Sequence, residues 1–209
     1  MSRSELAARL YGIYAIVDAR PGVVGLAGEL LAGGIKILQY RAKRGIVPDD
    51  LRQIRAMTKE HSAVLIVNDH WRAVEEFDAD GVHLGPDDAS ADDVRNIRVA
   101  LRDRLIGLSC GTEEEARIAQ AVGADYIGIG AVYATGSKAD AGSPIGAGEL
   151  QRIASAVTLP AAAIGGINAL RLLAIRESGV AMAAMISVFR DSKNPRATAG
   201  QLVALWNHP

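Results

Sequence analysis

The sequence predicts one α/β domain, residues 1–209, folded as a single closed (β/α)₈ barrel. Short apolar runs recur along the whole chain and mostly lack polar alternation, which is typical of strands buried on both faces of a parallel sheet. Segments with helical spacing separate these runs, so strand and helix alternate with a period of roughly 25 residues. A doubly wound open sheet is the alternative that the same alternation allows.

The expected strands follow one another without a linker, a low-complexity tract or a change of composition. Their apolar runs are residues 13–18, 35–41, 63–69, 81–85, 105–110, 126–132, 161–166 and 181–187. Eight units in 209 residues make a small barrel with short loops, and we expect its first two helices to be brief.

Two of the intervening helices have clear signals. Residues 48–61 place Leu51 and Ile54 near one face and charged residues on the other. After the fifth strand, Thr112 is in position to cap a helix whose first turn contains three glutamates. Gly123 stands where that helix should end.

Composition and charge are those of an ordinary globular protein, with 49% hydrophobic residues, 22% charged residues and a formal net charge of -1. The absence of a basic stripe argues against a nucleic-acid partner. No apolar run approaches the roughly 20 residues that cross a bilayer, and the first residues do not resemble a signal peptide. Cys110 is the only cysteine, so no internal disulfide can form, and we expect a cytoplasmic protein. The oligomeric state is left open, with a homo-oligomer as one option.

Polar side chains gather where the expected strands end, and active sites of barrels form at those ends. The second strand ends in Gln39, Arg41 and Lys43, whose alternation places an amide, a guanidinium and an ammonium on one side. Such a set suits a polyanion such as a diphosphate. A solvated strand end explains the triplet equally well when it is taken alone.

Carboxylates end the third and fourth strands. Asn68 and Asp69 close the third strand, and Asp87 and Asp88 follow the fourth. Turns and helix caps are the more ordinary use of each pair. Because Asp69 and Asp88 end successive strands, however, they could converge on one cation. Mg²⁺ takes oxygen ligands and is usually held by one or two carboxylates together with substrate phosphate.

The loop after the sixth strand contains Thr135, Ser137 and Lys138 and looks at first like a phosphate loop. Its order is not that of a P-loop, and the residues that follow do not open a helix. The loop could still offer hydroxyls and an ammonium to a phosphate, and a flexible surface loop is the alternative.

Two further strand ends resemble an anion site. Gly165 and Gly166 end the seventh strand, and Ile186 and Ser187 end the eighth. Barrels usually bind phosphate in the loops after these strands, where glycines let backbone N–H groups approach an anion. A simple turn is the alternative for the glycine pair. Two anion sites in one barrel favour a transferase over a hydrolase.

Two reactive residue types have a plainer explanation. His83 on the fourth strand is better explained as a satisfied core histidine than as a ligand, because no second histidine stands at metal spacing. Cys110 is better explained as an inert buried thiol, because no basic residue neighbours it.

In their order and spacing, the motifs resemble the thiamine phosphate synthase family from end to end. They are Q-Y-R-A-K, V-N-D, G-V-H-L-G-P-D-D, G-L-S, D-Y-I-G-I-G-A-V-Y-A-T-G-S-K, A-I-G-G-I-N and M-I-S. The resemblance implies a TIM barrel that joins hydroxymethylpyrimidine diphosphate to hydroxyethylthiazole phosphate, with Mg²⁺ required. The products would be thiamine phosphate and diphosphate.

The resemblance also implies a role for individual residues. The pyrimidine diphosphate would be held by Gln39, Arg41, Lys43, Asn68, Ser109 and Lys138, and Mg²⁺ by Asp69 and Asp88. The thiazole phosphate would lie among Thr135, Ser137, Gly166, Ile186 and Ser187. Arg41, Lys43, Ser109 and Lys138 would be catalytic. In the family's mechanism diphosphate leaves first, and the thiazole nitrogen attacks a carbocation stabilised by the pyrimidine.

Two departures from the family pattern concern substrate contacts and not the reaction class. Pro86 stands where glutamine is common after H-L-G, and Cys110–Gly111 replaces a small residue and a histidine. The alternatives are a thiazole tautomerase and a non-catalytic binder of thiazole or thiamine phosphate. A tautomerase would not need the cations of the second strand or the two carboxylates, and a binder would not need the carboxylate pair.

Overall fold

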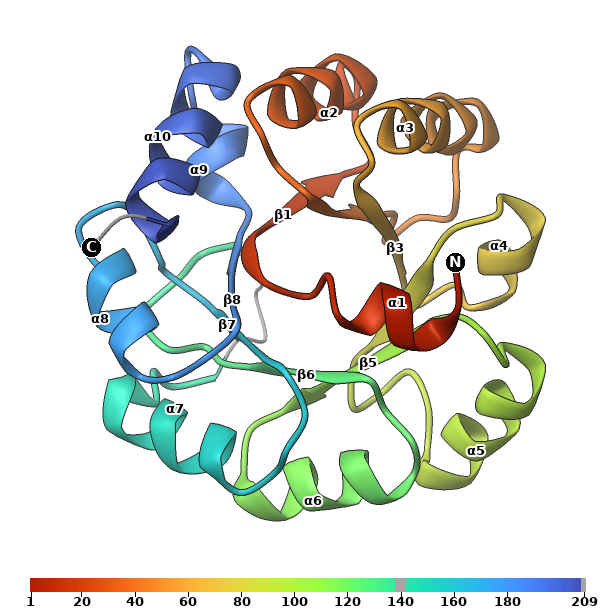
Figure 1. Cartoon of the computed structure of the whole chain (residues 1–209), viewed down its shortest axis with the longest axis vertical. Helices are drawn as coiled ribbons and strands as arrows, with labels where there is room; N and C mark the ends of the chain where they lie inside the picture. Colours follow the sequence, from red (N-terminus) through yellow and green to blue (C-terminus); the bar gives the residue numbers. More distant parts are fainter. Residues whose placement is uncertain (138–141, 208–209) are drawn as a thin grey trace.

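Eight parallel strands pair in sequence order, and β8 pairs with β1, so the sheet closes into a barrel. The computed structural model describes residues 1–137 and 142–207 (Figure 1). The strands are β1 (Gly12–Asp18), β2 (Ile37–Arg41), β3 (Val64–Asn68), β4 (Gly81–Leu84), β5 (Leu105–Cys110), β6 (Tyr126–Ile129), β7 (Ala161–Ile164) and β8 (Met182–Met185). This closed barrel confirms the predicted fold class and excludes the open sheet.

Helices surround the barrel (Figure 1). They are α2 (Val23–Ala32), α3 (Pro48–Glu60), α4 (Arg72–Glu76), α5 (Ala91–Ala100), α6 (Glu113–Ala121), α7 (Gly146–Ser155), α8 (Leu172–Glu177), α9 (Ser187–Arg190) and α10 (Pro195–Asn207), while α1 (Arg3–Ala7) precedes β1. Among the described residues, no helix is long and apolar enough to span a membrane.

The expectation that the first two barrel helices are brief is wrong. α2 has 10 residues and α3 has 13, whereas α4 has 5. α3 extends because Pro48 opens it and the buried positions Leu51, Ile54 and Thr58 recur on one face. The Thr112 side chain caps α6 as predicted, accepting a hydrogen bond from the Glu115 backbone N–H.

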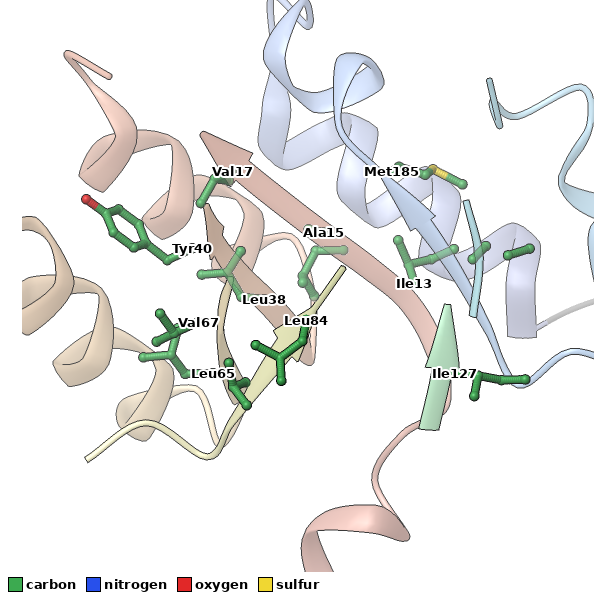
Figure 2. Close-up of a cluster of buried hydrophobic side chains, with 14 of the residues drawn as sticks. Ile13, Ala15, Val17, Leu38, Tyr40, Leu65, Val67, Leu84, Ile127 and Met185 are labelled. Carbon is green, nitrogen blue, oxygen red and sulfur yellow. The ribbon is translucent and has the colours of Figure 1, made fainter. Parts of the chain in front are cut away.

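Each strand is apolar on both faces because both faces are covered. Ile13, Ala15 and Val17 of β1 point outward into the layer between sheet and helices, which Figure 2 shows together with Leu38, Tyr40, Leu65 and Val67. Tyr14 and Ile16 alternate with them and belong to a second cluster that fills the barrel interior. The absence of polar alternation in the sequence therefore follows from the closed, helix-covered sheet.

The N-terminal end of the barrel is closed by packed residues of α1 and held by a buried carboxylate. Leu6 and Leu10, from α1 and the turn after it, are buried in the interior cluster, and Figure 1 shows α1 over the middle of the ring of strands. Asp80 Oδ2 accepts hydrogen bonds from Leu65 N at 2.8 Å and Arg55 Nη1 at 2.9 Å. This end is therefore devoted to packing and ion pairs, and the polar strand ends lie at the other.

Asp125 repeats the arrangement of Asp80 two strands further on. It stands one residue before β6, as Asp80 stands before β4, and it is buried. Its Oδ2 accepts hydrogen bonds from Ile106 N at 2.7 Å and from Arg98 Nη2 at 2.5 Å. Each carboxylate thus joins a backbone N–H of the preceding strand to an arginine of the helix before that strand.

Candidate active site

Two adjoining cavities open where the strands end. The first, which we call the cationic cavity, has a volume of about 330 Å³. Its lining includes Gln39, Arg41, Lys43, Asn68, Asp69 and Asp88. The second, the hydroxyl cavity, has a volume of about 310 Å³. Its lining includes Ser109, Thr135, Ser137, Gly166, Ile186 and Ser187. Both cavities are lined by Pro86, Gly128, Ile164, Ala184 and Ile186, which form a shared wall.

Most of the predicted site residues divide between the two cavities in the grouping that the resemblance implies, but Ser109, expected beside the pyrimidine, lines the hydroxyl cavity. Gln39, Arg41 and Lys43 do lie on one side, as their alternation predicts, because all three line the cationic cavity. Lys138 lies outside the described residues, so the structure does not bear on the prediction made for it.

Arg41 is the most enclosed cation of the cationic cavity. Its side chain is 10% exposed, and its Nη1 donates a hydrogen bond to Asp18 Oδ1 at 2.8 Å. Asp18 and Arg41 are cross-strand partners at the ends of β1 and β2, so the register of the sheet brings them together. Lys43 is exposed at the rim. One cation is therefore held in place, and the other is set in solvent.

Asp69 and Asp88 line the same cavity, and their carboxyl groups are close enough to interact. Burial, followed by the hydrogen bond and charge of Asp88, raises the pKa of Asp69 to about 6. The Asp69 backbone has a left-handed φ of 62° and donates its N–H to the His83 carbonyl at 2.9 Å. Asp88 Oδ2 also accepts the Gly85 N–H at 2.7 Å, so this carboxylate closes a turn as well.

The carboxylate pair suits a hard divalent cation. Two carboxyl groups in contact disfavour a second negative charge, which a cation would relieve. Carboxylate oxygens are also the ligands that Mg²⁺ prefers, and it commonly keeps waters or substrate phosphates as the rest of its shell. Among residues 1–137 and 142–207, no cluster of three or more His, Cys, Asp or Glu side chains could hold a metal. The donor set therefore fits Mg²⁺ shared with a phosphorylated ligand.

The hydroxyl cavity is shaped by backbone and small polar groups. The backbone N–H of Ser137 donates to Thr135 Oγ1 at 3.2 Å. Gly166 has a φ of 62°, and a Cβ there would lie 2.6 Å from the Ala134 carbonyl oxygen. Only glycine therefore lets the end of β7 approach the loop after β6 this closely. Ser187 begins α9, and β8 ends at Met185, two residues before it.

A hydrogen-bonded chain of side chains crosses the barrel between the cavities. Gln39 Nε2 donates to Tyr14 Oη at 2.7 Å, and Tyr14 Oη lies 3.0 Å from Tyr126 Oη. Tyr126 Oη lies 3.1 Å from His83 Nδ1, and His83 Nε2 lies 3.0 Å from Ser109 Oγ. The expectation that His83 is a satisfied histidine is confirmed, but the residue also lines the cationic cavity.

Tyr14, Asp18 and His83 are the residues that sequence reasoning did not assign to the site. A signal for the first two was present, because Asp18, Ile16 and Tyr14 alternate along β1 and so share a face. Since β1 pairs with β2 in parallel, that face lies beside Gln39. Strand order, once known, would have placed them in the site.

Cys110 lies in the wall of the hydroxyl cavity and is buried, as predicted. Burial, with a smaller contribution from the charge of Glu115, raises the pKa of its thiol to about 12. A thiol protonated at neutral pH is a poor nucleophile. Glu115 Oε2 accepts the Gly111 N–H at 2.5 Å, which fixes the turn after β5.

Comparison with known proteins supports the resemblance. A family model described as thiamine monophosphate synthase matches residues 13–189. The thiamine-phosphate synthase of Methanospirillum hungatei is 39% identical over 204 residues, covering 94% of this chain and 98% of that protein. That of Chlorobium phaeovibrioides is 41% identical over 194 residues, covering 90% of each. The structure of thiamine phosphate pyrophosphorylase from Pyrococcus furiosus aligns with a TM-score of 0.86 and 30% identity, covering 95% of this chain and 96% of that one. The chain therefore belongs to the thiamine monophosphate synthase family.

Proposed function

We propose that this chain couples hydroxymethylpyrimidine diphosphate to hydroxyethylthiazole phosphate, forming thiamine phosphate and releasing diphosphate. The observation that carries the proposal is the pair of adjoining cavities with a shared wall. One is lined by cations and carboxylates and the other by hydroxyls and glycines, so each matches one of two phosphorylated ligands. A site for a single ligand would need only one of them.

The cationic cavity would bind the diphosphate of the pyrimidine substrate. The Arg41 guanidinium and the Lys43 ammonium offer hydrogen bonds and charge to its oxygens, and Gln39 and Asn68 offer amides. Negative charge grows on the diphosphate as its bond to the pyrimidine methylene breaks. Fixed cations stabilise that charge without having to reorganise, which lowers the barrier to departure. Lys138, in the loop after β6, would add a third cation.

Asp69 and Asp88 would hold Mg²⁺ beside the diphosphate. When bound, the ion would supply further positive charge to the leaving group. The two carboxylates contribute oxygen ligands. The hydrogen bond from the Asp69 N–H to the His83 carbonyl and the one from the Gly85 N–H to Asp88 Oδ2 keep them in position.

The hydroxyl cavity would orient the second substrate. Its phosphate would lie among Thr135, Ser137, Gly166, Ile186 and Ser187, which places its thiazole ring toward the shared wall. The C–O bond to diphosphate breaks first, and its electron pair leaves with the oxygen. The thiazole nitrogen then donates its lone pair to the pyrimidine methylene carbon, forming the C–N bond. No protein nucleophile is required, which agrees with the protonated thiol of Cys110.

The proposal assigns this reaction to one catalytic domain, residues 1–209, working in the cytoplasm on small phosphorylated molecules. Cys110 is a free thiol, which suits a reducing compartment.

The first test follows thiamine phosphate and diphosphate together in a mixture of the purified protein, both substrates and Mg²⁺. We expect equal amounts of the two products, and their loss with chelator and with Asp69→Ala. Asp92→Ala is the control, because it removes an exposed carboxylate of α5 whose partner is Arg95 on the same helix.

Other outcomes would point to other functions. Isomerisation of the thiazole phosphate without coupling would indicate a tautomerase, and tight binding of either ligand without turnover would indicate a binder. Product formation unaffected by chelator or by Asp69→Ala would contradict the metal assignment alone.

A further inference from the structure

We propose that Tyr14, Tyr126 and His83 form a directional hydrogen-bond relay that fixes which groups Gln39 and Ser109 present to the substrate. The three are positioning residues, since they act through the two end residues. In this arrangement Gln39 presents a hydrogen-bond acceptor and Ser109 presents a donor. The assignment of the ligand rests on the proposed function, whereas the relay itself is a property of the free protein.

The relay begins at Gln39, whose side-chain amide donates through Nε2 to Tyr14 Oη. Tyr14 and Gln39 are each only 2% exposed, and Tyr126 is fully buried. A buried hydroxyl proton without an acceptor costs about 1–3 kcal/mol, so every proton along this chain should have one. Tyr126 lines neither cavity, so water cannot serve in the middle of the chain, and the direction of the first bond therefore constrains the rest.

Satisfying each proton in turn gives one order of donors. Tyr14 accepts from Gln39, so its own proton goes to Tyr126 Oη. Tyr126 then donates to His83 Nδ1, which must be unprotonated to accept. A neutral imidazole with an unprotonated Nδ1 carries its proton on Nε2, and that proton goes to Ser109 Oγ. The hydroxyl proton of Ser109 is left to donate to another acceptor.

The phenols stay neutral, as the relay requires. Burial raises the pKa of Tyr14 well above its usual value, and burial likewise raises the pKa of Tyr126, with the neighbouring Tyr14 adding to the effect. Each ring therefore keeps its proton to donate at physiological pH.

Two glycines make room for the relay inside a barrel that is otherwise tightly filled. A Cβ at Gly107 would lie 2.1 Å from Tyr126 Cζ, and one at Gly128 would lie 3.0 Å from His83 Cε1. Gly107 pairs with His83 on the neighbouring strand β4, and Gly128 pairs with Ser109 on the neighbouring strand β5. Glycine therefore stands at the two interior positions where a larger residue would collide with the Tyr126 or His83 ring.

The same chain of bonds could run in reverse only if the Gln39 amide turned over. Tyr14 would then donate to Oε1, every later bond would reverse, and Ser109 would donate to His83 instead of outward. Reversing the hydrogen bond at Gln39 therefore requires reversing the one at Ser109, and the converse also holds. This coupling makes the cationic cavity favour a ring that offers a donor to Gln39, and the hydroxyl cavity favour a group that offers an acceptor to Ser109.

An aminopyrimidine meets the requirement at Gln39, because its exocyclic amine is a donor. A pyrimidinone, with a carbonyl in place of the amine, would direct an acceptor at the Gln39 carbonyl oxygen. The relay resists the amide turn that would accommodate it. The relay thus gives a physical reason for recognition of the amine that the pyrimidine half of thiamine carries, and a pyrimidinone is the analogue that the relay would reject.

The first experiment is ¹⁵N NMR of the histidine rings in the free protein, with the His83 signals identified by their loss in His83→Gln. We expect a single neutral tautomer with its proton on Nε2. In Tyr126→Phe the Nδ1 loses its donor, and the signals should move toward the average of two tautomers. Tyr14→Phe is the second variant in case the first does not fold.

Tyr40→Phe is the matched control. Tyr40 is also fully buried, in the layer between the sheet and the helices, and its hydroxyl accepts a hydrogen bond from Val47 N outside the relay. It should leave the His83 signals unchanged. A proton on Nδ1 in the unmodified protein, or no change in both relay variants, would overturn the proposal.

The second experiment compares kcat/KM for the aminopyrimidine and pyrimidinone diphosphates in each variant. Their intrinsic reactivities differ, but that difference cancels when the ratio is compared between variants. We expect Tyr126→Phe to lower the ratio about tenfold, the size of one lost hydrogen bond. Tyr40→Phe should preserve it, and equal ratios in all three proteins would contradict the relay.

The two failures can be told apart. If the unmodified protein makes no thiamine phosphate, the proposed function is wrong, and the NMR experiment still decides the relay. If it makes product while the His83 signals are the same with and without the Tyr126 hydroxyl, the proposed function stands and the relay is wrong.

Discussion

At the scale of single residues, the site depends on partners that bind no ligand themselves. Asp18 is 30% exposed and Arg41 is 10% exposed, so the carboxylate faces solvent and the guanidinium faces the cavity. The pair holds the arginine in one of its many rotamers before a substrate arrives. Pre-organisation of this kind reduces the ordering that binding would otherwise require.

We expect Asp18→Asn to lower kcat/KM for the diphosphate substrate about tenfold, because a hydrogen bond to a charged group contributes about 1.5–3 kcal/mol. Steady-state kinetics with varied pyrimidine diphosphate would measure it. Asp49→Asn is the control, since Asp49 pairs with Arg52 at the same 2.8 Å distance on the exposed face of α3. Equal effects of the two substitutions would show that the Asp18 pair has no special role.

Residues at strand ends could be predicted from the sequence because parallel strands of a barrel end on the same face. Gln39, Asn68 and Asp69 follow this rule. The relay could not be predicted, because Tyr14 and Tyr126 meet over a separation of 112 residues and no local pattern marks either one. Their rings look like ordinary strand residues until the register is known. The ligand roles of the site residues stay predictions.

At the scale of elements, ion pairs connect the helices at the N-terminal end of the barrel. Asp78, between α4 and β4, contacts Lys59 of α3 at 2.7 Å and Arg104, before β5, at 2.8 Å. Hydrogen bonds from Lys59 and Arg104, with the charge of Arg55, hold the pKa of Asp78 well below its usual range. One carboxylate thus links three consecutive βα units.

Asp78→Asn should destabilise the protein by about 1 kcal/mol at pH 7, since the partners are partly exposed. A lowered pKa contributes stability above the unfolded value of about 4 and loses it as pH falls toward the folded value. The difference in Tm should therefore be about 2–4 °C at pH 7 and shrink below pH 4. Asparagine tolerates the left-handed φ of 54° at this position, so the backbone should not confound the measurement.

Asp103→Asn is the matched control for this prediction, because Asp103 is an exposed carboxylate that lines the same surface cavity as Asp78. It should change Tm by less than Asp78→Asn at pH 7. A Tm difference for Asp78→Asn that grows at low pH would reverse the sign of the argument.

The strands were easier to predict than the helix lengths. A strand buried on both faces leaves a continuous apolar run, so its position is visible in the sequence. Where a helix ends depends on how far its apolar face has sheet to cover, which is a tertiary property. α2 therefore runs for 10 residues although the sequence led us to expect a brief helix.

At the scale of the whole molecule, stability and chemistry occupy opposite ends of the barrel. At the N-terminal end, Leu6 of α1 fills the barrel interior, and the carboxylates Asp80 and Asp125 are buried. The C-terminal end has both cavities. Substitutions at the N-terminal end should therefore affect the free energy of unfolding more than they affect turnover.

Leu6→Ala tests this separation. Leu6 is 1% exposed in the barrel interior, and truncating such a leucine typically costs about 2–5 kcal/mol. Denaturant unfolding should show that loss, while kcat/KM of the folded enzyme should stay within about twofold. Leu173→Ala, at a leucine that is 55% exposed, should change neither. A large fall in kcat/KM at unchanged stability would refute the separation.

The shared wall between the two cavities has a consequence for inhibition. A compound that joined the pyrimidine diphosphate to the thiazole phosphate in one molecule would reach from one cavity into the other and would occupy both at once. Such a ligand loses translational and rotational freedom once, where two separate substrates lose it twice, and each half raises the effective concentration of the other. A non-reactive bisubstrate compound of this kind should therefore bind more tightly than either substrate alone, whereas thiamine phosphate, which lacks the diphosphate, should bind mainly through the hydroxyl cavity.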